Sequence, residues 1–194
     1  MKLVFGVGIN DADYVVKKME FIGGKRKLVW FCPFYMAWKS MMARCYSPKL
    51  HEKYPTYVGC IVCAEWLTFS NFRRWMEVQT WEGRQLDKDI LISGNKVYGP
   101  EHCVFVDPKT NSFLTDRGAA RGEWPIGVTL DRRIGNLEAR CSNPFTGKRE
   151  HLGLFTDPAS AHEAWRKRKH ELAAMLAEKQ ADERVAAALR TRFL

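Results

Sequence analysis

The sequence predicts an α+β fold with two modules joined by a linker. Two short apolar runs surround a turn-rich loop at 85–106 and are followed by a short helix, which predicts two strands and a helix. Three short segments of alternating polarity precede a long amphipathic helix over 124–177, which predicts a small sheet packed on one helix. Between them lies a stretch with two glycines and no apolar periodicity. We therefore expect a first domain at 1–115, a linker at 116–123 and a second domain at 124–194.

The composition predicts a globular protein with an anionic partner. The 194 residues carry a net charge of +9, and basic residues outnumber acidic ones in both halves. Nucleic acid is the commonest partner for such a balance, because each phosphate that is neutralised releases counterions. No apolar run approaches the roughly 20 residues of a membrane span, and the N-terminus is too short for a signal peptide. The expected location is the cytoplasm, with no membrane association and no small-molecule cofactor.

In the first module, the apolar spacing and the turn signals place the elements that precede the 85–106 loop. Gly23-Gly24 predicts a hairpin turn between two strands, and Pro33–Tyr46 has the apolar stripe of a helix. The polar stretch 49–55 predicts an exposed loop. A short strand at 57–63 and a second helix ending near Met76 are expected to follow.

The run from Gln85 to Leu91 is the candidate site of chemistry. On a strand, Asp87 and Asp89 at positions i and i+2 point to the same face, and two like charges side by side are relieved by a bound cation. A returning strand at 103–106 then leads into a helix at 108–114, for which Asp107 is the expected N-cap.

In the second module, the strands are expected at 125–130, 136–141 and 148–155. Pro158 opens the long helix, whose apolar stripe thins after Ala177, so that the last turns are expected to be exposed or frayed.

The outward face of this predicted sheet is basic. Leu137, Ala139 and Cys141 alternate inward toward the helix, so that the residues between them point out. Arginine on an open sheet face suits duplex DNA, because it binds guanine through two hydrogen bonds or clamps a phosphate. The candidate DNA-binding residues are Arg132, Arg133, Arg140, Lys148, Arg149 and His151.

The cysteines leave two alternatives open. Only Cys60 and Cys63 have metal-ligand spacing, and no second pair of this spacing completes a site. A structural zinc would draw on Cys45, Cys60, Cys63 and Cys103; otherwise these residues are buried free thiols.

The residues from Glu123 to Ala177 resemble the ethylene-response-factor type of DNA-binding domain. The resemblance rests on Trp124–Val128, on Leu137–Arg140 and on the Leu-Gly-x-Phe signature at 152–155 before an Ala-rich helix. It implies a three-stranded sheet that reads the major groove of double-stranded DNA with its exposed face. At the third-strand position where the family usually has a large aromatic residue, this chain has His151.

The first module resembles phage-borne endonucleases of the HNH class, the free-standing homing type that often carries such a C-terminal module. The matching segments are Trp38 with Arg44–Tyr46, Val62–Phe69, Leu86–Ile90, Gly94-Asn95, and Tyr98–Val106 with Asn111. The resemblance implies a ββα-metal fold in which Asp87 and Asn111 hold one divalent ion, Mg²⁺ or alternatively Mn²⁺, with Asn95 as the loop asparagine.

This resemblance implies a DNA endonuclease that hydrolyses phosphodiester bonds with one metal ion. The family's general-base histidine follows the strand aspartate, where this chain has Lys88. A lysine accepts a proton at neutral pH only when its pKa is strongly lowered. The candidates for the base are therefore Lys88, Asp89 and His102, and Asp89 is alternatively a second ligand of the metal ion. The alternative is a catalytically inactive DNA-binding protein of phage origin, acting as a regulator or a host-interference factor.

Overall fold

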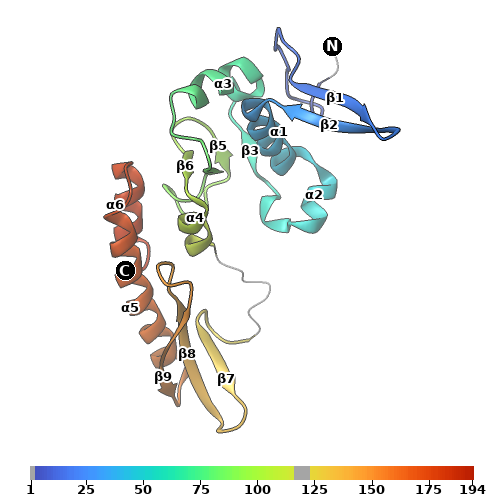
Figure 1. Cartoon of the computed structure of the whole chain (residues 1–194). Helices are drawn as coiled ribbons and strands as arrows, with labels where there is room; N and C mark the ends of the chain where they lie inside the picture. The colour runs from blue at the N-terminus through green and yellow to red at the C-terminus, as the bar shows by residue number, and fades with distance from the viewer. Residues whose placement is uncertain (1–2, 116–122) are drawn as a thin grey trace. The chain divides into compact units, whose positions relative to one another are not determined.

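The computed structural model describes residues 3–115 and 123–194 of the chain. The chain divides into two compact units, Met1–Val106 and Asp107–Leu194, which are described separately. Both contain helices and strands, so the predicted α+β class is confirmed (Figure 1). The predicted linker at 116–123 lies outside the described residues, apart from Glu123.

The first unit combines small sheets with helices. Its two-stranded sheets are β1-β2 and β4-β6, which are antiparallel, and β3-β5, which is parallel. The elements are β1 Lys17–Ile22, β2 Lys25–Phe31, α1 Pro33–Tyr46, α2 Pro48–Lys53, η1 Pro55–Tyr57, β3 Ile61–Val62, η2 Glu65–Leu67, α3 Phe69–Glu77, β4 Gln85–Asp87, β5 Val97–Tyr98 and β6 Val104–Val106.

Aromatic side chains form the core of this unit. Trp38 on α1 and Trp66 are both fully buried, and the Trp38 indole Nε1 donates a hydrogen bond of 2.7 Å to the Trp66 carbonyl oxygen. Phe69 and Phe72 on α3 pack against these indoles with ring-centroid separations between 5.1 and 5.6 Å. The apolar stripes that predict α1 and α3 are therefore core stripes.

The hairpin turn at Gly23-Gly24 is confirmed, whereas the loop predicted at 49–55 is wrong. Both glycines have positive φ, as a tight hairpin turn requires. Residues 48–53 form α2 instead of a loop, because the Ser47 hydroxyl oxygen accepts a hydrogen bond from the Leu50 amide and Pro48 opens the helix. Because α2 has no buried residues, the segment carries no apolar stripe from which this short, capped helix could be predicted.

The second unit is a three-stranded antiparallel sheet with helices. Its elements are α4 Pro108–Leu114, β7 Val128–Asp131, β8 Asn136–Ser142, β9 Arg149–Phe155, α5 Pro158–Ala177 and α6 Glu183–Thr191, with the strands in the order β7-β8-β9. Asp107 and Asp157 cap α4 and α5 by accepting hydrogen bonds from Thr110 N and Ser160 N, as the sequence predicts for α4.

One face of this sheet is covered by α5. Val128, Leu137 and Ala139 are buried on the inward face together with Ala161 of α5. The predicted inward alternation of Leu137, Ala139 and Cys141 is confirmed, because all three are buried.

The prediction that the chain is exposed or frayed beyond Ala177 is wrong. Asp182 caps α6 by accepting a hydrogen bond from Arg184 N, and Val185, Ala186 and Leu189 are buried. This short second apolar stripe packs α6 against α5. No helix among the described residues is long and apolar enough to cross a membrane.

Candidate catalytic loop and nucleic-acid interface

The candidate catalytic loop begins where β4 ends. Asp87 is the last residue of β4 and pairs with Val104 of β6. Its Oδ1 accepts hydrogen bonds from the amides of Asp89, at 2.7 Å, and Ile90, at 2.8 Å. These bonds turn the chain away from the sheet, in the manner of an Asx-turn. Burial raises the pKa of the Asp87 carboxyl, and the two amide bonds oppose that rise.

The expected pairing of Asp87 and Asp89 on one strand face is wrong. The strand stops at Asp87, so Asp89 lies in the turn that the Asp87 side chain stabilises. The Asp89 carboxylate instead accepts hydrogen bonds of 2.7 Å from Lys88 Nζ at both of its oxygens. Like-charge repulsion across a strand face therefore gives no reason for a cation at this place.

Lys88 and Asn95 hold the loop together. The Lys88 side chain is 5 % exposed, and its Nζ donates to the Asp89 carboxylate and to the Asn95 carbonyl oxygen. The Asn95 side chain donates to the carbonyl oxygens of Lys88 and Val97 at 2.8 and 2.7 Å, and accepts from the Val97 amide. These contacts commit Lys88 Nζ to the loop, so the geometry favours a structural role for Lys88 over the role of a base.

We predict that Lys88→Met destabilises the first unit by about 1–3 kcal/mol, because the Asn95 carbonyl and the Asp89 carboxylate lose their donor. Thermal denaturation measures the change. Lys39→Met, which removes an exposed lysine of α1, is the matched control and should leave the melting temperature unchanged. A Lys88→Met protein as stable as this control would contradict the structural role.

His102 lies in the turn before β6. Its Nδ1 is buried without a hydrogen-bond partner among the described residues. Its ring lies near Gly99, where a Cβ atom would be 4.0 Å from His102 Cδ2 and 3.6 Å from Cys63 Sγ. No hydrogen bond joins His102 to Asp87 within the described part of the chain, so its role as the base stays a prediction.

The four cysteines of the proposed zinc site are free thiols. Cys45, Cys60 and Cys103 are buried, and Cys63 is half-buried. Burial raises the pKa of Cys45 to about 12 and that of Cys103 to about 12. Among residues 3–115 and 123–194, no three His, Cys, Asp or Glu side chains are grouped so as to hold a metal ion. Structural zinc therefore stays a prediction.

Asp87 offers one carboxylate oxygen to a divalent cation. Mg²⁺ keeps several waters and uses one or two protein carboxylates together with substrate phosphate. The backbone amides occupy Asp87 Oδ1, whereas Oδ2 has no hydrogen bond within the described residues. One carboxylate oxygen therefore fits such an ion. Asn111 lies on α4 of the second unit, and the ion that the resemblance places between it and Asp87 stays a prediction.

Arg44 is a polar neighbour of this loop that the predicted site lacked. Its Nη1 donates to the Leu86 carbonyl oxygen at 3.2 Å and lies 3.5 Å from the Tyr98 hydroxyl. The signal in the sequence is an arginine in the last turn of α1, next to the buried Cys45.

The outer face of the second unit's sheet carries the predicted DNA-binding residues. Arg140 of β8 stands opposite His151 of β9, and Ser142 stands opposite Arg149. Glu138 orients the first pair, with Arg140 Nε at 2.7 Å and His151 Nδ1 at 2.6 Å from its Oε1. The hydrogen bond from Arg140, together with that from His151, lowers the pKa of the Glu138 carboxyl.

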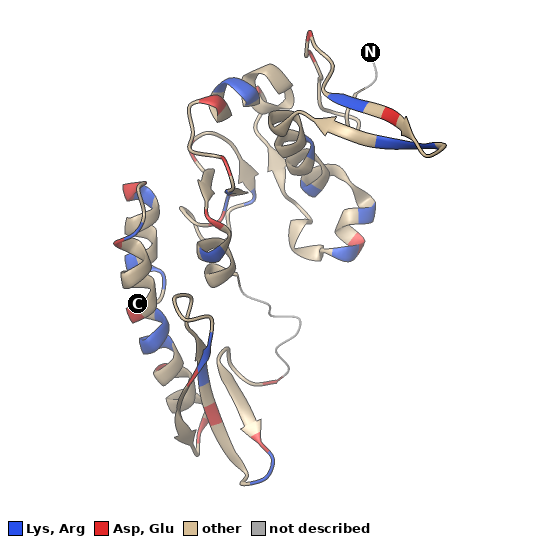
Figure 2. Cartoon of the chain, in the orientation of Figure 1, with Lys and Arg blue, Asp and Glu red and all other residues tan. Residues whose placement is uncertain are grey.

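Basic turns extend this face at both ends. Arg132 and Arg133 lie in the β7–β8 turn, where Arg133 pairs with Asp131 at 2.9 Å, and Lys148 lies in the β8–β9 turn (Figure 2). Because β8 has seven residues, the two turns are about 20 Å apart. The structure therefore brings the six predicted residues onto one face and its ends, and all six are exposed. We call these six residues the basic face.

No protein family, curated protein or solved structure matches the chain.

Proposed function

We propose that the chain binds double-stranded DNA through the basic face. The observation that carries the proposal is the row of exposed cations along β8, β9 and their turns, on the side of the sheet that α5 leaves uncovered. Arginine and lysine in a row about 20 Å long match several successive phosphates of a duplex. Glu138 holds Arg140 and His151 in fixed orientations, which reduces the conformational entropy lost on binding.

We predict that Arg132→Gln and Lys148→Gln each weaken binding to any duplex and lower the salt dependence of binding by about one released counterion. Fluorescence anisotropy with a labelled duplex at several salt concentrations gives the slope. The control is Lys167→Gln, which removes the same charge from an exposed position on α5. Equal slopes for all variants and the wild type would overturn the proposed interface.

We further propose that the first unit cleaves DNA as a metal-dependent endonuclease, with Asp87 as the carboxylate ligand. The supporting observation is a carboxylate fixed at the end of β4, whose Oδ2 has no hydrogen bond to any residue within 3–115 and 123–194. A bound Mg²⁺ or Mn²⁺ would stabilise the charge on the phosphorane and on the leaving oxygen. Asp87 binds the cation, and Lys88 and Asn95 fix the loop that carries it. His102 is the base candidate that makes no hydrogen bond to the loop, and its Nδ1 has no partner in the part of the chain that the structure describes.

The second candidate function is DNA binding without cleavage. The hydrogen bonds of Lys88 support it, because the residue at the family's histidine position is committed to the loop. Supercoiled plasmid and phage DNA incubated with Mg²⁺ or Mn²⁺ distinguish the two candidates. Nicked or linear product that disappears in EDTA supports the nuclease. Undiminished binding without any product supports the binding protein.

A further inference from the structure

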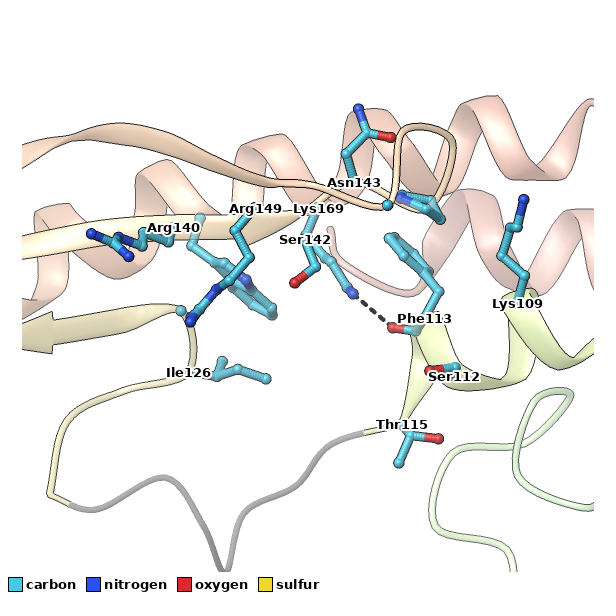
Figure 3. A pocket seen from close by; sticks show the side chains of 14 residues that line it. Lys109, Ser112, Phe113, Thr115, Ile126, Arg140, Ser142, Asn143, Arg149 and Lys169 are labelled. Carbon is cyan, nitrogen blue, oxygen red and sulfur yellow. Dashed lines mark hydrogen bonds between the residues drawn. The ribbon is translucent and has the colours of Figure 1, made fainter.

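A basic cavity of about 750 Å³ lies in the second unit, between α4, the ends of β8 and β9, and α5 (Figure 3). Its size is in the usual range for ligand sites. Four of its lining residues are cations, and none is Asp or Glu. The cations are Lys109, Arg140, Arg149 and Lys169.

Lys169 is the unusual member of this set. Its Nζ donates a hydrogen bond of 2.6 Å to the Phe113 carbonyl oxygen and lies 3.4 Å from the centroid of the Phe113 ring (Figure 3). No carboxylate in the described part of the chain forms an ion pair with it. Burial lowers its pKa to about 8. An ammonium has three donors, so the single hydrogen bond leaves two for an anion that enters the cavity.

A purely structural role does not account for this arrangement. A methionine at position 169 would fill the space beside Phe113 and Trp165 without the cost of burying a charge. The contact with Phe113 stabilises the ammonium in part, whereas desolvation by burial lowers the pKa of Lys169. Lys169 is half-buried, and a partly desolvated cation without an acidic partner among the described residues is stabilised when an anion binds next to it.

The cavity is continuous with the basic face. Arg140, Ser142 and Arg149 point outward from the sheet and also line the cavity. A DNA strand that follows the basic face therefore meets two of the cations that also line the cavity, Arg140 and Arg149.

We propose that this cavity binds a phosphate group of the DNA strand that lies on the sheet, with Lys169 and Lys109 as donors beyond the face itself. This proposal rests on the proposed DNA binding, and it adds the cavity beside the sheet as a second place where the DNA is bound. Arg149 bridges the two, since it belongs to both the basic face and the cavity. The shared ligand chemistry is a phosphate oxyanion, from a DNA backbone or from free phosphate.

The test uses the full chain and substitutions that separate the cavity from the face. Lys169→Gln and Lys109→Gln change the cavity, Arg132→Gln changes the face, and Lys167→Gln is the exposed control on α5. Duplex affinity is measured by anisotropy, and the ε-methylene signals of Lys169, assigned with Lys169→Gln, are followed by NMR during titration with duplex or with inorganic phosphate. We expect a roughly tenfold loss of affinity for Lys169→Gln and less than twofold for Lys167→Gln.

The outcomes are distinct. Lys169 signals that move with duplex alone assign the cavity to a backbone phosphate, and signals that move with inorganic phosphate as well assign it to any phosphate oxyanion. If Arg132→Gln weakens binding while Lys169→Gln and Lys109→Gln bind as the control does, the DNA interface stands and the cavity site is overturned. If neither the wild type nor any variant binds duplex, the proposed DNA binding fails, and the titration with inorganic phosphate tests the cavity separately. Lys169 signals that do not move in that titration overturn the inference.

Discussion

Asp87→Asn is expected to abolish metal-dependent cleavage while leaving the first unit folded. An asparagine keeps an oxygen that accepts hydrogen bonds from the Asp89 and Ile90 amides, so the turn after β4 persists. It removes the negative charge that a divalent cation requires. We expect a loss of cleavage rate on the order of 10³-fold, comparable to the removal of a principal electrostatic group from an active site. Plasmid nicking in Mg²⁺ or Mn²⁺ measures it.

Asp87→Ala is the companion variant, because it removes both the charge and the turn acceptor. It should match Asp87→Asn in lost cleavage and also melt at a lower temperature, by an amount equivalent to about 1–3 kcal/mol for two amides left without an acceptor. Duplex binding should be nearly unchanged in both variants, since the basic face is in the second unit. Wild-type cleavage rates for Asp87→Asn would remove Asp87 from the metal site.

Much of the fold could be predicted because its elements carry local signals. Gly23-Gly24 dictates a tight turn, and Asp107 followed by Pro108 dictates a helix start, whatever lies around them. The alternation of Leu137, Ala139 and Cys141 fixes which face of β8 meets α5. The same alternation placed Arg140 on the outer face, so the basic face could be predicted from sequence in its main part.

The errors arose where a single hydrogen bond decided the local structure. The Ser47 hydroxyl starts α2 in a polar segment, and the Asp182 carboxylate starts α6 where the apolar stripe of α5 ends. The Asp87 side chain ends β4, which removes Asp89 from the strand face. Apolar periodicity averages over many residues and is insensitive to one side chain that caps or turns the chain.

The environment of Lys169 lay beyond sequence reasoning for a different reason. The residue is four positions after Trp165 on a helix rich in lysine and arginine, where an exposed charge is the ordinary expectation. Its burial depends on Phe113, a residue 56 positions away in the chain that contacts it only in the folded unit. Long-range packing of this kind leaves no periodic signal.

Lys169→Met is expected to stabilise the second unit at neutral pH, and this gain should shrink as the pH rises. The folded pKa of about 8 lies below the ordinary value of 10.5, so between these values the unfolded chain binds more protons than the folded one. The stability of the wild-type protein therefore rises with pH across this window. At pH 7 the whole penalty is present, at most about 3 kcal/mol and about 1–2 kcal/mol after allowing for contact with water. Above pH 10.5 the lysine is neutral in both states and the penalty is absent.

The groups that surround Lys169 do not reverse this sign. The charged and titratable side chains that line the same cavities are Lys109, Arg140, Arg149, His162, Arg166 and Arg192, and the buried Cys141 thiol lies close by. Arginine stays charged throughout the window, so the difference between the wild type and Lys169→Met isolates the titration of one lysine. Denaturant unfolding at pH 7, 8.5 and 10.5 measures this difference in the free energy of unfolding. Lys167→Met is the control, and its unfolding free energy should differ little from that of the wild type at every pH. If the difference in unfolding free energy between Lys169→Met and the wild type stays constant with pH, the partial burial of the ammonium does not destabilise the folded unit. The reason for an anion in the cavity would then disappear, since the same unrelieved charge underlies both the lost stability and the proposed affinity for phosphate.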